Sequence, residues 1–237
     1  MKQSMILLHG LFGGLSNWEG VITHFASRFD IHVPPLPIYD QHSDDNLEYL
    51  VKFLENYIIA AQLENVILVG NSLGGHIAIL YTHRHPEKVS RLILTGSSGL
   101  YENTSMGSYP KRGNYAYIRE RVAYTFYDPA IATDTLVDEV FSTTTNARKC
   151  FSIVKMAKSA QRNYVADILP RIPTPVLLVW GEDDKITPPD VALEFKRHLP
   201  QAVLVTLSRC GHAPMMERPA EFNAAVESFL SGCLTSA

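Results

Sequence analysis

The sequence predicts an α/β fold in which a parallel, doubly wound sheet is interrupted by one helical insertion. Short apolar runs alternate with helical patterns toward both ends of the chain, and this alternation is typical of parallel sheets, whose strands are joined by crossover helices. One apolar run stops at a Gly-x-Ser-x-Gly turn that leads directly into a helix. Between Gly96 and Pro173, by contrast, no convincing strand occurs.

Six runs are apolar almost throughout, as expected for parallel strands that helices cover on both faces. They span residues 5–8, 30–33, 65–69, 91–95, 175–180 and 202–207. The clearest helices outside the insertion span residues 47–61, 72–84 and 219–230. We expect Ser43 to be the N-cap of the first of these helices, and Pro86 to limit the second.

The insertion is expected to form a helical cap, or lid. A connection between a strand and a helix needs far fewer residues than this segment has, so we assign residues 98–169 to the cap. Residues 1–97 and 170–237 then form the core. Amphipathic stretches near residues 115–127, 135–141 and 147–166 predict the helices of the cap. The cap leaves the sheet at the edge where open α/β sheets bind ligands.

Composition narrows the class of protein. With 237 residues, 46% of them hydrophobic and 19% charged, the chain is able to bury a sizeable core. A net charge of −3 without a basic cluster predicts neither a nucleic-acid nor a membrane partner. Three scattered cysteines, Cys150, Cys210 and Cys233, favour a reducing compartment and have no zinc-site spacing. The first apolar run is too short for a signal peptide, so we expect a cytoplasmic protein with a small-molecule substrate.

Ser72 lies at the point where a strand turns sharply into a helix. Such a turn forces the serine into a strained, exposed backbone conformation, so its hydroxyl stands clear of the sheet edge. Gly70 and Gly74 are expected because side chains there would collide, and Gly75 lets the helix approach the sheet. The N-terminus of the helix also directs amide groups toward the oxygen that Ser72 would attack.

A serine hydroxyl is a weak nucleophile that needs a base, and the base needs a group to orient it. Asp183 and Asp184 follow the strand that ends near Trp180, and His212 follows the next strand. The chain order serine, aspartate, histidine is the order found in α/β hydrolases. Either aspartate is able to supply the acid on this reasoning alone.

Four motifs in order make the chain resemble an α/β-hydrolase-fold serine hydrolase with a helical lid, of the branch that holds esterases and carbon–carbon hydrolases. They are His9-Gly10-Leu11-Phe12-Gly13-Gly14, the turn from Gly70 to Gly74, Gly181-x-x-Asp184, and Gly211-His212-x-Pro214-x-x-Glu217-x-Pro219. The resemblance implies that Ser72 is the nucleophile, His212 the general base and Asp184 the orienting acid. It also implies that the backbone amides of Leu11 and Leu73 form the oxyanion hole.

The chain departs from the family pattern in two places. The two N-terminal strands usual in the family are missing, which predicts a smaller sheet, and residues 34–40 replace the usual loop after the second strand. Among the other histidines, His9 is expected to hydrogen-bond loop backbone. His76, at the start of the helix after Ser72, is a candidate for contact with substrate.

The favoured function is hydrolysis of a small, largely apolar carboxylic ester, with no metal and no organic cofactor. The alternative is carbon–carbon hydrolysis of ring-fission diketones, because Asn71 before the serine resembles the enzymes of that group. Those enzymes usually have a tryptophan after the base histidine, where this chain has Ala213. A ligand receptor or inactive scaffold on the same fold is a third hypothesis. The oligomeric state is not indicated.

Overall fold

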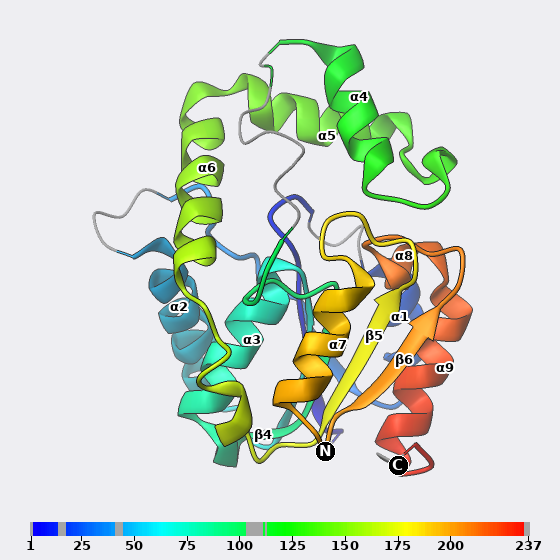
Figure 1. Cartoon of the computed structure of the whole chain (residues 1–237). Coiled ribbons are helices and arrows are strands. Elements are labelled where there is room, and N and C mark those ends of the chain that lie inside the picture. The colour runs from blue at the N-terminus through cyan, green and yellow to red at the C-terminus, as the bar shows by residue number, and fades with distance from the viewer. Residues whose placement is uncertain (1, 14–17, 41–44, 103–110, 112, 235–237) are drawn as a thin grey trace.

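The computed structural model describes residues 2–13, 18–40, 45–102, 111 and 113–234. Its centre is a six-stranded sheet in the order β2-β1-β3-β4-β5-β6, and all neighbouring strands are parallel (Figure 1). The strands are β1 (Ser4–Leu8), β2 (Asp30–His32), β3 (Val66–Asn71), β4 (Val89–Thr95), β5 (Val176–Gly181) and β6 (Val203–Leu207). The predicted fold class and all six predicted strands are confirmed. Within the described residues no strand precedes β1.

Helices cover both faces of the sheet and divide the core into two layers. They are α1 (Glu19–Phe25), α2 (Asn46–Ala60), α3 (Leu73–Arg84), α7 (Pro189–His198), α8 (Pro214–Glu217) and α9 (Pro219–Leu230), with short 3-10 turns at Pro86–Lys88, Pro129–Ile131 and Leu169–Arg171. Alternate β1 residues face opposite layers: Ile6 packs in the layer formed with α2, α3 and α7, and Leu7 in the layer formed with α1 and α9. The burial of every β1 residue follows from this arrangement.

The chain order changes direction beside β1, which pairs with β2 on one side and β3 on the other. The loops after β1 and β3 therefore leave the sheet side by side at its carboxyl edge. An added Cβ on Gly10 would lie 3.2 Å from Ser72 Cβ, which shows how closely the two loops approach. Ligands bind at such a switch point in open α/β sheets.

The N-cap of α2 is Asp45 and not Ser43, which lies outside the described residues. The Asp45 carboxylate accepts a hydrogen bond from the Leu47 amide at 3.0 Å, which satisfies one of the unpaired amides of the first turn. The expectation for Ser43 was wrong because several capping residues precede this helix, and the sequence does not say where its first turn closes.

The inserted segment contains α4 (Tyr115–Tyr124), α5 (Asp134–Thr145) and α6 (Ala147–Arg162), which lie above the carboxyl edge of the sheet (Figure 1). Asn114, Thr133 and Asn146 cap their N-termini through side-chain oxygens. The two connections to the core are joined where the Val165 amide donates to the Gly99 carbonyl at 2.9 Å. Among the helices in the described ranges, none is long and apolar enough to cross a membrane.

Candidate active site

Ser72 lies between β3 and α3 with φ 53° and ψ −120°, a conformation that non-glycine residues rarely adopt. Two glycines permit this turn. A Cβ on Gly74 would lie 2.1 Å from the Leu8 carbonyl oxygen, and a Cβ on Gly70 would lie 2.6 Å from the Gly74 backbone. The predicted collisions are therefore present, and the strained serine is held at the carboxyl edge of the sheet.

The structure brings His212 and Asp184 together. His212 Nδ1 donates a hydrogen bond to Asp184 Oδ2 at 2.9 Å, and both side chains are buried. The same carboxylate accepts from the Ile186 amide at 2.8 Å and from the Thr187 amide and hydroxyl, each at 2.9 Å. Asp183, the alternative acid, is only half-buried, and its amide donates to the Cys210 carbonyl. The geometry therefore favours Asp184 as the partner of His212.

Two opposing effects act on the pKa of His212. Burial alone would lower it, because the protonated ring is poorly solvated there. The Asp184 carboxylate raises it through its charge and its hydrogen bond, with smaller contributions from Glu102 and Glu217, and the net pKa is raised. Because the Nδ1 proton is donated to Asp184, the neutral ring has its lone pair on Nε2, the tautomer that a general base requires.

The loop that carries His212 is fixed by Glu217. The Glu217 carboxylate accepts from the amides of Gly211 at 2.9 Å, Ala213 at 3.1 Å and Tyr127, on the cap, at 2.8 Å. The His212 amide in turn donates to the Thr125 carbonyl of the cap at 3.0 Å. The sequence placed Glu217 in the motif around His212 but indicated no role for its side chain. A carboxylate five residues after the candidate base was the signal that could have identified this role.

Asn71 has a structural role that its position in the sequence did not reveal. Its side-chain amide donates to the Thr95 carbonyl at 3.0 Å and to the His212 carbonyl at 3.1 Å. Asn71 thereby connects the ends of β3 and β4 to the loop of the candidate base.

Ser72 and His212 line one cavity of about 310 Å³ between the core and the cap. Leu11 and Leu73, the candidate oxyanion residues, line it as well. Glu102 and Arg121 place charged groups on a wall that is otherwise mostly apolar, and neither was singled out from the sequence as a cavity residue. The apolar side chains on the wall are Leu11, Phe12, Leu73, Val122, Phe126, Leu136, Val140, Ala157, Ala160, Ile186, Ala213 and Met216.

Two other histidines lie near this region. His9 Nδ1 donates to the Gly10 carbonyl at 2.8 Å, as expected, and burial lowers the pKa of His9. His76 is fully buried and does not line the cavity, so the structure does not support it as a candidate for contact with substrate. Burial lowers the pKa of His76 to about 4, so the ring is neutral near pH 7.

The part of the chain that the structure describes contains no group of three or more His, Cys, Asp or Glu side chains that could hold a metal ion. Cys210 is buried beside His212, and burial raises the pKa of its thiol, which keeps the thiol protonated.

A parallel sheet with a strained serine after β3, and a histidine paired with a carboxylate after the last strands, defines the class of α/β hydrolases. The chain belongs to the alpha/beta hydrolase family, whose model matches residues 5–225. It is an enzyme family, and the relatives of this chain include an esterase and carbon–carbon hydrolases.

One solved structure, an α/β-hydrolase enzyme from the metagenome of sediments from the lagoon of Mar Chica, Morocco, is 37% identical. It matches with a TM-score of 0.79 over 98% of this chain and 92% of that one. A pimeloyl-(acyl-carrier protein) methyl ester esterase of Nitrosomonas europaea is 28% identical over 92% of each chain. A 2-hydroxy-6-oxo-6-(2'-aminophenyl)hexa-2,4-dienoic acid hydrolase of Metapseudomonas resinovorans is 27% identical over 97% of this chain and 84% of the relative.

Proposed function

We propose that this protein is a serine hydrolase that cleaves a small, largely apolar carboxylic ester through an acyl-enzyme. The observation that carries the proposal is the 2.9 Å hydrogen bond between His212 and Asp184 at the cavity that Ser72 also lines. The esterase among the relatives supports this choice of bond. The free cysteines, two of them buried, fit the reducing, cytoplasmic location that we infer for it.

In the proposed reaction, His212 takes the proton of the Ser72 hydroxyl as Oγ attacks the ester carbonyl. The amides of Leu11 and Leu73 stabilise the oxyanion of the tetrahedral intermediate. Protonated His212 gives its proton to the departing alcohol, and an acyl-enzyme remains on Ser72. Water then attacks the acyl group with His212 again as the base, and the carboxylic acid is released. These steps use no metal or organic cofactor.

The wall of the cavity supports an apolar acyl group. Val122, Phe126, Leu136 and Val140 face it from the cap, and Met216 faces it from the core. Burial of apolar surface there stabilises the bound substrate by roughly 25 cal/mol per Å². This energy selects acyl chains by size and needs no positioned donors.

A fluorophosphonate probe tests the nucleophile directly. We expect the probe to label the protein at Ser72, and Ser72→Ala to abolish both labelling and ester turnover. Ser98, which is buried and lines the same cavity, is the matched control, and Ser98→Ala should still be labelled. Labelling that survives in Ser72→Ala would show that another residue is the nucleophile.

Carbon–carbon hydrolysis is the second candidate, favoured by relatives such as the Metapseudomonas enzyme. Asn71, which first suggested it, has its side-chain amide engaged with Thr95 and His212. Ala213 occupies the place after the base histidine. We therefore expect kcat/KM for a short-chain apolar ester to exceed that for a ring-fission diketone at least about tenfold, or ~1.4 kcal/mol. Equal turnover of the diketone would favour the second candidate.

A receptor on this fold would bind an ester and turn it over once at most. Steady multiple turnovers of a p-nitrophenyl ester distinguish an enzyme from such a receptor. A single stoichiometric burst without further turnover would favour the receptor.

A further inference from the structure

Helix α6 of the cap presents a row of basic side chains on one side. The row consists of four basic residues and one aromatic residue: Arg148, Phe151, Lys155, Lys158 and Arg162. Their spacing alternates between three and four residues, which places them within an arc of about 80° around the helix. We call these five residues the α6 stripe. The helix is about 24 Å long and its sequence contains no acidic residue.

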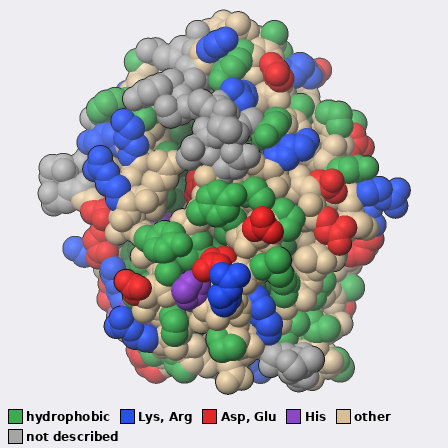
Figure 2. Space-filling model, in the orientation of Figure 1, with side chains coloured by type: hydrophobic (Ala, Val, Ile, Leu, Met, Phe, Trp, Pro, Cys, Tyr) green, Lys and Arg blue, Asp and Glu red, His purple; other side chains and the backbone are tan. Residues whose placement is uncertain are grey.

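The packing of α6 fixes the direction of this stripe. On the opposite side of the helix Cys150, Ile153 and Met156 are buried. Two serines at the boundary attach the helix to the core: Ser152 donates to the Tyr39 carbonyl at 3.0 Å, and Ser159 donates to Asp45. The α6 stripe therefore faces outward, and Figure 2 shows basic side chains gathered at the left of the molecule, over α6.

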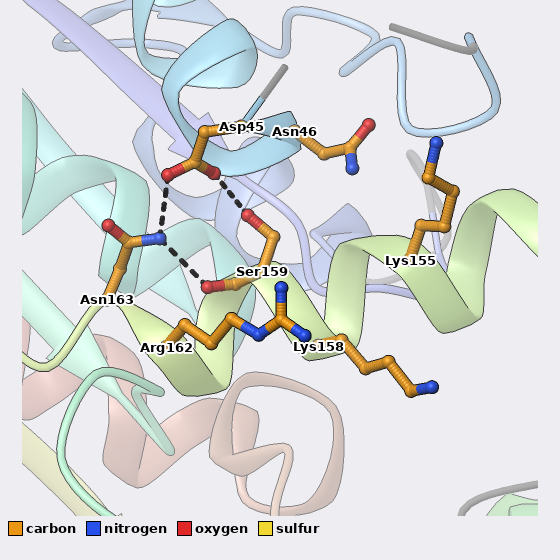
Figure 3. A pocket seen from close by; sticks show the side chains of 7 residues that line it. All are labelled: Asp45, Asn46, Lys155, Lys158, Ser159, Arg162 and Asn163. Carbon is orange, nitrogen blue, oxygen red and sulfur yellow. Dashed lines mark hydrogen bonds between the residues drawn. The ribbon is translucent and has the colours of Figure 1, made fainter. Parts of the chain in front are cut away.

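A cavity of about 500 Å³ lies beside the stripe, between α6 and the start of α2 (Figure 3). Among the described residues that line it, Asp45 is the one carboxylate, and it already accepts hydrogen bonds from the Leu47 amide, Ser159 and Asn163. Figure 3 shows Lys155 and Lys158 pointing away from this network. These two lysines thus lie on the side of the cavity away from the Asp45 carboxylate.

One exposed aromatic ring lies within the row and another lies just beyond it. Phe151 is 55% exposed, and Tyr164, just beyond the end of α6, is 58% exposed. A protein-binding site usually has an apolar centre and a polar rim. Here four of the five side chains are cationic, and the one ring among them, Phe151, has Lys155 Nζ 5.5 Å from its centroid. A cluster of four basic side chains on one side of a helix is typical of a segment that binds anionic lipid headgroups.

We propose that the α6 stripe binds the surface of an anionic phospholipid membrane. Lipid phosphates contact Lys155, Lys158 and Arg162, and the Phe151 ring enters the headgroup region. Composition predicted no membrane partner because the net charge of −3 averages over the whole surface, whereas this charge is local. The proposal concerns peripheral binding and is independent of the reaction at Ser72.

Co-sedimentation of the full chain with vesicles tests it. We expect binding to vesicles of equimolar phosphatidylglycerol and phosphatidylcholine at low salt, no binding to pure phosphatidylcholine, and release as salt shortens the screening length. The double variant Lys158→Glu/Arg162→Glu should bind at least about tenfold more weakly. Phe151→Ser should also weaken binding. The matched control is Lys2→Glu/Arg171→Glu, which makes the same change in net charge at exposed residues that precede β1 and β5. The affinity of this control for anionic vesicles should stay within about twofold of that of the unmodified protein.

Equal circular dichroism spectra and unfolding temperatures would show that the variants are folded; if the glutamate pair is not, Lys158→Gln/Arg162→Gln replaces it. Failure of the unmodified protein to bind anionic vesicles would overturn the proposal, as would equal loss of binding in the stripe and control variants. Salt-sensitive binding to a helical acidic peptide without binding to vesicles would assign the stripe to an acidic protein partner, and would also overturn it.

Discussion

Replacing Asp184 by asparagine changes one oxygen to an NH2 group, and the structure determines which one. Oδ1 accepts from the amides of Ile186 and Thr187, whose protons are fixed by the backbone. The one oxygen that the asparagine side chain keeps must stay there, so its NH2 replaces Oδ2 and faces His212 Nδ1. An NH2 group donates to Nδ1, which moves the ring proton to Nε2 and removes the lone pair that would accept the Ser72 proton.

The expected cost is therefore the cost of the wrong tautomer, with the shape of the site unchanged. In a serine–histidine–aspartate site this change lowers kcat about 10⁴-fold, which corresponds to ~5.5 kcal/mol of transition-state stabilisation. The measurement is steady-state turnover of a short-chain p-nitrophenyl ester, with the unfolding temperature as a check that the variant is folded.

Asp183→Asn is the matched control, because it makes the same chemical change one residue earlier at a half-buried carboxylate. We expect its kcat to fall by less than about threefold, as for a surface substitution worth a few tenths of a kcal/mol. Equal effects of the two substitutions, or the reverse order, would refute the assignment of Asp184 as the orienting acid.

Four further expectations concern the site. Because the Asp184 charge raises the pKa of His212, kcat/KM should increase with pH, with a midpoint above about 6.5, the ordinary pKa of a histidine side chain. A midpoint below about 6.5 would contradict this account. EDTA should leave the rate unchanged, and a loss of activity on chelation would contradict the metal-free steps. Glu217→Gln turns an NH2 group toward at least one of the three backbone amides that the carboxylate accepts from. We expect this to reduce the free energy of unfolding, measured by denaturant titration, by about 1–3 kcal/mol. An unchanged value would show that these bonds contribute little. Gly74→Ala, whose Cβ would meet the Leu8 carbonyl at 2.1 Å, should yield little folded protein, and normal stability would show that the elbow is able to relax.

The parts of the fold that depend on local sequence were predictable. The run before Ser72, the Gly-x-Ser-x-Gly turn and the small residues after it specify a strand, a sharp turn and a helix without reference to the rest of the chain. Asp184 was preferred to Asp183 by motif spacing, and the network around Thr187 now gives this preference a physical reason. The inner strands β1, β3 and β5 were predictable because residues buried on both faces leave a nearly unbroken apolar run.

Features that depend on contacts between distant segments were not predictable. Glu217 accepts a hydrogen bond from the backbone amide of Tyr127, which lies in the cap 90 residues away in the sequence. The amide group of Asn71 reaches His212 across 141 residues. The α6 stripe was overlooked for a different reason: its charges are spaced along the sequence and only a helix aligns them, so no run of basic residues marks it.

The bonds between the cap and the loop of His212 have a consequence for how substrate enters. The cap is held where its two connections bond at Gly99 and Val165, and along α6 where Ser152 and Ser159 bond to the core. It is held again where Thr125 and Tyr127 meet residues 211–217. A segment attached at several separated places has no free edge on which to open as a hinged lid. Pressure from a bulky acyl chain on α4 would thus be carried to the backbone that aligns the imidazole. An oversized substrate would then slow the chemical step itself, and its effect would be seen in kcat as well as in KM.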